Sequence, residues 1–209
     1  KFLGQSVDAR AAALGNAVTA LGEGSSTAMF YNPAAMARMS GFSHLSLDRV
    51  EWIGDISYNA GSIAFQPASG LYGVFGLSVM SVDYGDFLGT IRSTNDEGFV
   101  DTGTFSPTAL ALGFGYARSL TNQFSVGANI KYAKQDLGSS VIGLDEEGNR
   151  TRRDRSADTF AYDFGVLYDT GFRSLKFAVN ARNFSRELVY VEENFELPLL
   201  VTIGLSTVL

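Results

Sequence analysis

Few side chains in this 209-residue sequence could do chemistry. His44 is the single histidine, and the sequence places no serine and aspartate to complete a nucleophilic triad with it. Cysteine is absent, which excludes disulfides and thiolate metal sites. The acidic run at 145–147 is not followed by the alternating ligands of a calcium loop. We therefore expect no catalytic residue, no metal site and no cofactor.

Charged side chains are the remaining candidates for binding. One group lies in a polar segment and consists of Arg150, Arg152, Arg153 and Arg155. Since arginine binds phosphate through a planar fork of donors, this group is a candidate for contacts with phosphate groups or an acidic partner. The alternative is a solvated loop in which the arginines pair with nearby acidic residues. The formal net charge of −6 argues against nucleic acid as a partner.

The other charged residues lie in predicted β-strands. These strands are recognised because large apolar and small residues alternate along them with a period of two. Within 109–117, large apolar residues at even positions alternate with alanine and glycine at odd positions. The same alternation returns in 124–133 and predicts strands with one apolar face. Eight strands are predicted in this way, at 42–50, 56–66, 71–82, 107–118, 123–135, 158–169, 174–184 and 198–208.

The alternation also assigns each polar residue of these strands to a face. Placing Phe160 and Phe164 on the apolar face puts Asp163 on the opposite one. By the same rule, the polar residues that share the opposite face are Lys131, Asp163, Lys176, Asn180 and Arg182. These side chains either brace and hydrate an interior or bind a substrate or a plug, and both interpretations stay open.

The links between the predicted strands are alternately short and long, apart from a modest link at 51–55 that the order of the links places on the side of the long ones. The short ones are 67–70, 119–122 and 170–173, and the long ones are 83–106, 136–157 and 185–197. Outer-membrane barrels have short periplasmic turns and longer extracellular loops, and their strands need about 9–11 tilted residues to cross the hydrocarbon. A soluble β-sandwich is the alternative, but it has no reason to make alternate links long. We therefore predict an all-β fold, a transmembrane antiparallel up-and-down β-barrel.

The first forty residues have a different character. Val7–Ala20 is rich in alanine and leucine and predicts a short helix followed by a strand or turn. Asn32 before Pro33 resembles a helix cap, which predicts an apolar helix over Pro33–Met39. Since so short a helix is unstable alone, it must pack on something, and the barrel lumen is the simplest place. The sequence therefore divides into a plug at 1–40 and barrel strands at 41–209.

The order of motifs along the chain resembles one family of membrane proteins. The motifs are Phe2-Leu3, Ala9-Arg10, Leu14-Gly15-Asn16-Ala17, Ala28-Met29-Phe30-Tyr31-Asn32-Pro33-Ala34, Asp83-Tyr84-Gly85-Asp86, Tyr116-Ala117, Phe124-Ser125-Val126-Gly127, Lys131-Tyr132 and Asn183-Phe184. Together they resemble the PorV/PorQ family of outer-membrane proteins. That family is related to FadL, the long-chain fatty-acid channel, whose hatch also carries an Asn-Pro-Ala motif. The resemblance identifies Arg10, Asn32, Pro33 and Ala34 as the plug motif.

The resemblance implies a barrel of about 14 strands, within the size range of such proteins. An eight-stranded barrel is filled by its own side chains and has no room for a plug. We therefore expect this chain to be a C-terminally incomplete part of a longer one. The implied function is non-enzymatic: type IX secretion, with secreted cargo or a translocon subunit as partner. The alternatives are FadL-like uptake of hydrophobic small molecules and a surface scaffold. The implied location is the outer membrane of a Gram-negative-type bacterium, in contact with lipid and lipopolysaccharide.

Overall fold

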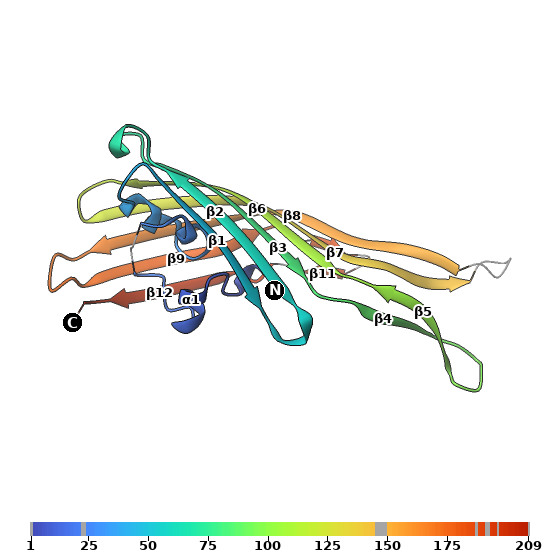
Figure 1. Cartoon of the computed structure of the whole chain (residues 1–209). Coiled ribbons are helices and arrows are strands. Elements are labelled where there is room, and N and C mark those ends of the chain that lie inside the picture. Colours follow the sequence, from blue (N-terminus) through green and yellow to red (C-terminus); the bar gives the residue numbers. More distant parts are fainter. Residues whose placement is uncertain are drawn as a thin grey trace.

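An antiparallel β-sheet of eight strands dominates the computed structural model, which describes residues 2–21, 24–144, 150–186, 188–190, 193–195 and 197–208. The strand order is β1-β2-β3-β6-β7-β8-β9-β12 (Figure 1). The strands are β1 Ser43–Glu51, β2 Ser57–Phe65, β3 Val74–Asp83, β6 Thr108–Ser119, β7 Phe124–Leu144, β8 Arg150–Asp169, β9 Lys176–Ser185 and β12 Leu200–Ser206. The all-β, antiparallel prediction is confirmed, and each predicted strand segment overlaps one of these eight strands.

The long links contain strands that the sequence did not predict. β4 (Phe87–Arg92) pairs with β5 (Phe99–Phe105), and β10 (Leu188–Tyr190) pairs with β11 (Glu193–Phe195). The prediction of a loop at 136–157 was wrong as well, because β7 continues to Leu144 and β8 begins at Arg150. β4, β5, β10 and β11 span only three to seven residues each, so a search for long apolar alternation passed over them. In Figure 1 the β4–β5 and β7–β8 hairpins extend beyond the rest of the sheet.

Within the part of the chain that the structure describes, the sheet has two edges. β1 pairs only with β2, and β12 pairs only with β9, so these strands form an open sheet and not a closed cylinder.

One face of the sheet, called the outer face below, is a continuous apolar surface. Register partners on successive strands form a row across it, from Leu45 through Ile63, Leu77, Phe114, Ile130 and Tyr162 to Phe184. The exposed fractions of these side chains run from 38% to 65%. A large contiguous apolar surface of this kind marks contact with a membrane or another protein.

The N-terminal segment, residues 2–21 and 24–40, packs on the opposite face, called the inner face below. Its helices are η1 (Phe2–Gly4), α1 (Ala9–Ala13), η2 (Ser26–Phe30) and η3 (Pro33–Arg38); two further one-turn 3₁₀ helices, η4 (Ile53–Asp55) and η5 (Pro67–Gly70), lie in strand links. The helix predicted in Val7–Ala20 is confined to α1 and is followed by turns. The helix predicted at Pro33–Met39 is a 3₁₀ helix that ends at Arg38.

Glycines on the inner face let the N-terminal segment approach the sheet closely. A Cβ atom added at Gly127 would lie 2.5 Å from the backbone nitrogen of Ala34 and 2.5 Å from the carbonyl carbon of Pro33. At Gly76, an added Cβ would lie 2.5 Å from the Met29 sulfur. The small residues of the alternation therefore provide the space that η2 and η3 occupy.

We predict that Gly127→Ala destabilises the folded protein by about 1–3 kcal/mol, the usual cost of overpacking a tight site. The new methyl group would meet the backbone of η3, which cannot move aside as a flexible side chain can. Gly61→Ala is the control, because the atoms nearest to an added Cβ there would be methyl groups of Leu47 and Val79, at 3.2 and 3.3 Å. Equilibrium unfolding in urea measures both variants. Equal unfolding free energies for the two would contradict the close packing of η3 on β7.

Candidate functional site

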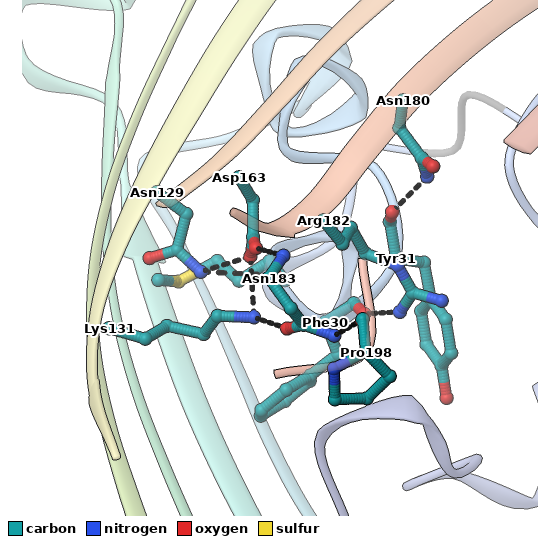
Figure 2. A network of polar contacts seen from close by, with 10 residues as sticks. Phe30, Tyr31, Asn129, Lys131, Asp163, Asn180, Arg182, Asn183 and Pro198 are labelled. Atoms are coloured by element: carbon teal, nitrogen blue, oxygen red, sulfur yellow. Dashed lines mark hydrogen bonds and ion pairs between the residues drawn. The ribbon is translucent and has the colours of Figure 1, made fainter. Parts of the chain in front are cut away.

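A buried carboxylate forms the centre of the polar contacts on the inner face. Asp163 on β8 is fully buried and forms an ion pair with Lys131 on β7, with 2.8 Å between Oδ2 and Nζ (Figure 2). Asn129 donates from Nδ2 to the same oxygen at 3.2 Å, and the backbone N–H of Asn183 donates to Oδ1 at 2.8 Å. Because a buried charge must be paired and hydrogen-bonded, these three donors are what permits a carboxylate at this position.

Asn183 reaches this centre through a β-bulge in β9. The pairing of β8 with β9 shifts between Phe164↔Ala181 and Tyr162↔Phe184, so two residues of β9 lie opposite Asp163. Asn183 has φ 64, a left-handed conformation that asparagine adopts more readily than most residues. Its side chain accepts from Lys131 at 2.7 Å and donates to the carbonyl of Pro198 at 3.2 Å. Strict alternation assigns Asn183 to the outer face, so the sequence prediction missed it.

Three side chains of the sheet hold three consecutive carbonyl groups of the N-terminal segment. Asn129 donates to the carbonyl of Met29 at 3.3 Å, Arg182 donates to that of Phe30, and Asn180 donates to that of Tyr31 (Figure 2). The Arg182 guanidinium also lies over the Tyr31 ring, 5.9 Å from its centroid. We call Asn129, Asn180 and Arg182 the carbonyl clamp. It satisfies backbone acceptors at the end of η2, where the chain leaves its helical pattern.

Asn32 links the helix that follows to the sheet. Its Oδ1 accepts from the backbone N–H of Ala34 at 3.1 Å, which caps η3, and Pro33 occupies the first helical turn. Its Nδ2 donates to the carbonyls of Thr19 at 2.9 Å and Val166 at 3.2 Å. One amide therefore joins two parts of the N-terminal segment to β8, which gives the Asn-Pro-Ala sequence a physical role.

The structure places the remaining predicted residues apart from this centre. Lys176 donates to the carbonyl of Leu21 at 3.3 Å. Arg10 lies on α1 and lines a pocket of about 330 Å³ together with Asp8, Tyr31 and His44. Of the arginine group, Arg155 is exposed on β8, whereas the side chains of Arg150, Arg152 and Arg153 lie outside the described part of the structure.

His44 and Tyr31 make structural contacts. Nδ1 of His44 lies 3.3 Å from the backbone nitrogen and 3.0 Å from the hydroxyl oxygen of Ser26, which ties η2 to β1. The Tyr31 hydroxyl accepts from the backbone N–H of Val7 at 3.0 Å. Burial raises the pKa of Tyr31, and the Asp8 carboxylate raises it further, so the phenol stays protonated at neutral pH.

These contacts can hold a segment of chain in place, because donors on β7 and β9 end on backbone carbonyls of the N-terminal segment. Within the described residues, no group of three or more histidine, aspartate and glutamate side chains could hold a metal ion. Nor does the described part of the chain contain a helix long and apolar enough to cross a membrane. The chain matches no protein-family model and no curated protein sequence.

We predict strong coupling between Lys131 and Asp163 in a double-mutant cycle. Lys131→Met leaves the carboxylate without its cation, Asp163→Asn leaves a buried ammonium, and each should cost about 3–5 kcal/mol. The double variant removes both charges and should cost less than the sum of the singles by about 0.5–3 kcal/mol. Unfolding free energies of the four proteins give the coupling. If the costs of the two single substitutions simply add in the double variant, the interaction between Lys131 and Asp163 does not stabilise the folded protein.

Proposed function

We propose that this chain forms the wall and plug of an outer-membrane β-barrel of the PorV/PorQ type, which docks proteins and catalyses no reaction. The docked protein is secreted cargo or a subunit of the type IX translocon. The resemblance in the sequence motifs suggests this family, and the surface of the sheet supports a membrane location.

The observation that carries the membrane location is the apolar belt on the outer face. Along β8 the outer residues from Phe160 to Tyr168 are all apolar or aromatic, a span of nine residues. A tilted strand needs about 9–11 residues to cross the hydrocarbon. The belt ends toward the long hairpins in a polar row that includes Arg49, Asn59 and Ser81. Apolar side chains between polar borders are what a lipid-facing wall requires.

The two edges of the sheet support a larger barrel. Unpaired backbone groups of a strand cannot face lipid, because nothing there satisfies their hydrogen bonds. In a membrane, β1 and β12 must therefore pair with further strands. The resemblance implies a total of about 14 strands. A barrel of that size is wide enough to enclose the N-terminal segment.

The contacts of the N-terminal segment favour docking over uptake. An opening hatch would have to break the carbonyl clamp, the Asn32 contacts and the bond from Lys176 to Leu21. The β4–β5 and β7–β8 hairpins instead offer a surface beyond the belt, and they contact each other where Phe105 lies beside Gly138 (Figure 1). We assign partner binding to these hairpins, since loops beyond a rigid wall commonly carry such a function.

We predict that Leu112→Arg prevents stable insertion into membranes. Leu112 lies near the middle of β6 and is 47% exposed between Val79 and Tyr132. Arginine at the middle of a barrel wall costs about 2–4 kcal/mol, whereas near the interface it costs about 0–1 kcal/mol. Leu120→Arg, in the β6–β7 turn, is therefore the control. Flotation with lipid vesicles measures insertion, and equal flotation of the two variants would contradict the proposed wall.

We predict that shortening the β4–β5 hairpin removes partner binding and leaves the barrel inserted. Residues 89–103 would be replaced by Asn-Gly, a turn that suits a two-residue hairpin. Leu88 and Thr104 are paired in the sheet, so the new turn would close an existing register. Pull-down from outer membranes should lose secreted proteins or the translocon subunit. An unchanged set of partners, with a hydrophobic small molecule retained in the barrel, would favour uptake instead.

A further inference from the structure

The β4–β5 hairpin, which extends beyond the rest of the sheet, has an unpaired backbone edge (Figure 1). In the described part of the chain, β4 pairs with β5 and with no other strand. Residues of an antiparallel ladder alternate between bonding to the partner strand and facing away from it. Ser93 donates its backbone N–H to the carbonyl of Gly98 across the hairpin, at 3.0 Å. By this alternation, the backbone groups of Leu88, Thr90 and Arg92 face the free edge.

The edge of β4 lacks the usual protection against pairing with another strand. Natural edge strands are commonly protected by proline, by charged side chains, especially lysine, or by a bulge. β4 contains neither proline nor lysine, and its one charged residue, Arg92, stands at its end. The shift in register lies on the other strand, where Thr102 is the extra residue of β5. The edge of β4 is therefore straight enough and bare enough to accept a further strand.

The two faces of the hairpin differ in character. One face is apolar: the rings of Phe87 and Phe105 stack with their centroids 5.7 Å apart, and Ile91 pairs with Val100 two residues further along β4. The other face is exposed to solvent and carries Leu88, Thr90 and Arg92 of β4. A strand added to β4 would thus have one apolar and one solvent-exposed side.

The exposed carboxylates of the hairpin give it a negative charge. Asp101 on β5 pairs in register with Thr90, so it lies on the solvent-exposed face. Asp96 and Glu97 lie at the tip. Among the described residues, none of these three carboxylates forms an ion pair, and Arg92 is the one cation between them and the base of the hairpin. A basic segment therefore fits the charge of this surface.

We propose that β4 accepts an extended segment of the docked protein as an additional antiparallel strand, and that this segment alternates basic with apolar residues. The backbone of Leu88, Thr90 and Arg92 supplies its hydrogen bonds, as in other cases of strand addition to a sheet edge. A basic side chain opposite Thr90 extends over this small residue toward Asp101. The apolar residues of the segment continue the other face, beside Phe87 and Ile91. The inference rests on the proposed docking function and adds the mode of recognition and the chemistry of the partner.

Substitutions on β4 and β5 test the two parts of the proposal separately. Thr90→Pro removes an N–H of the free edge and no bond to β5, and proline is tolerated at such edge positions. Thr90→Val is its matched control, because it keeps the N–H and a β-branched side chain. Asp101→Asn removes the charge alone. The probes are two fluorescent peptides, one of alternating lysine and valine and one of alternating glutamate and valine. Fluorescence anisotropy measures their binding to the full-length protein in phosphatidylcholine nanodiscs, whose lipid carries no net charge.

The wild type and Thr90→Val should bind the lysine peptide and not the glutamate peptide. Thr90→Pro should weaken binding of the lysine peptide about tenfold, because a backbone hydrogen bond is lost and the proline ring meets the added strand. Asp101→Asn should weaken it about two- to fourfold, the contribution of one exposed ion pair. Equal binding of both peptides by the wild type, or unchanged binding of the lysine peptide by Thr90→Pro, would overturn the proposal.

A change in the peptide tests the same hydrogen bonds if Thr90→Pro fails to fold. In an antiparallel pair, residues opposite Leu88, Thr90 and Arg92 share their face and turn their own N–H groups toward β4. These residues are the lysines of the probe. N-methylation of the lysines should therefore weaken binding to the wild type about tenfold, whereas N-methylation of the valines should change it much less. Equal effects of the two modifications would overturn the proposal.

Pull-down from outer membranes separates failure of this inference from failure of the proposed function. If partners are lost when residues 89–103 are replaced but are retained by Thr90→Pro, the hairpin docks them without adding a strand, which overturns the inference alone. If both variants retain the same partners as the wild type, docking at this hairpin is overturned together with the inference. Loss of the same partners from both variants, and not from Thr90→Val, is the result that the proposal predicts.

Discussion

The Asp163 carboxylate is the constraint on which the arrangement of the inner face depends. It is fully buried, so its charge must be matched within the fold, and three groups do so. Each of these groups also makes a second contact. Lys131 binds the Asn183 side chain, Asn129 reaches the carbonyl of Met29, and Asn183 donates to the carbonyl of Pro198. Removal of the carboxylate would take away the shared partner of Lys131 and Asn129 on β7 and of Asn183 on β9.

The alternation of large apolar residues with small or polar residues along each strand produces both faces of the sheet. On β6, large apolar residues point outward, and their odd-numbered neighbours are alanines and glycines that leave room for η2 and η3. Asn129 and Asp163 interrupt the small residues on β7 and β8 where the N-terminal segment presents unpaired backbone carbonyls. The outer face therefore suits lipid, and the inner face suits a segment of irregular backbone.

The strands and their faces could be predicted from the sequence because alternation is a local signal. Lys131, Asp163, Asn180 and Arg182 all lie on the inner face to which alternation assigned them. Asn183 could not be placed in this way, since a bulge shifts the register without any change in composition. The β4–β5 hairpin was missed because its strands are short, at six and seven residues, and lie inside a link that was predicted as a loop. Which donors meet which carbonyls depends on contacts between residues more than 100 positions apart, and no local pattern encodes these.

We propose that the outer face contacts lipid, whereas the N-terminal segment covers the inner face. The absence of cysteine allows a nitroxide label to be attached at single introduced cysteines along β6, from Thr108 to Ser119. Collision rates with oxygen and with a water-soluble nickel complex can then be measured in vesicles. The account predicts high oxygen and low nickel accessibility at positions 110, 112, 114 and 116, and low accessibility to both at the positions between them. High nickel accessibility at positions 112 and 114 would contradict it.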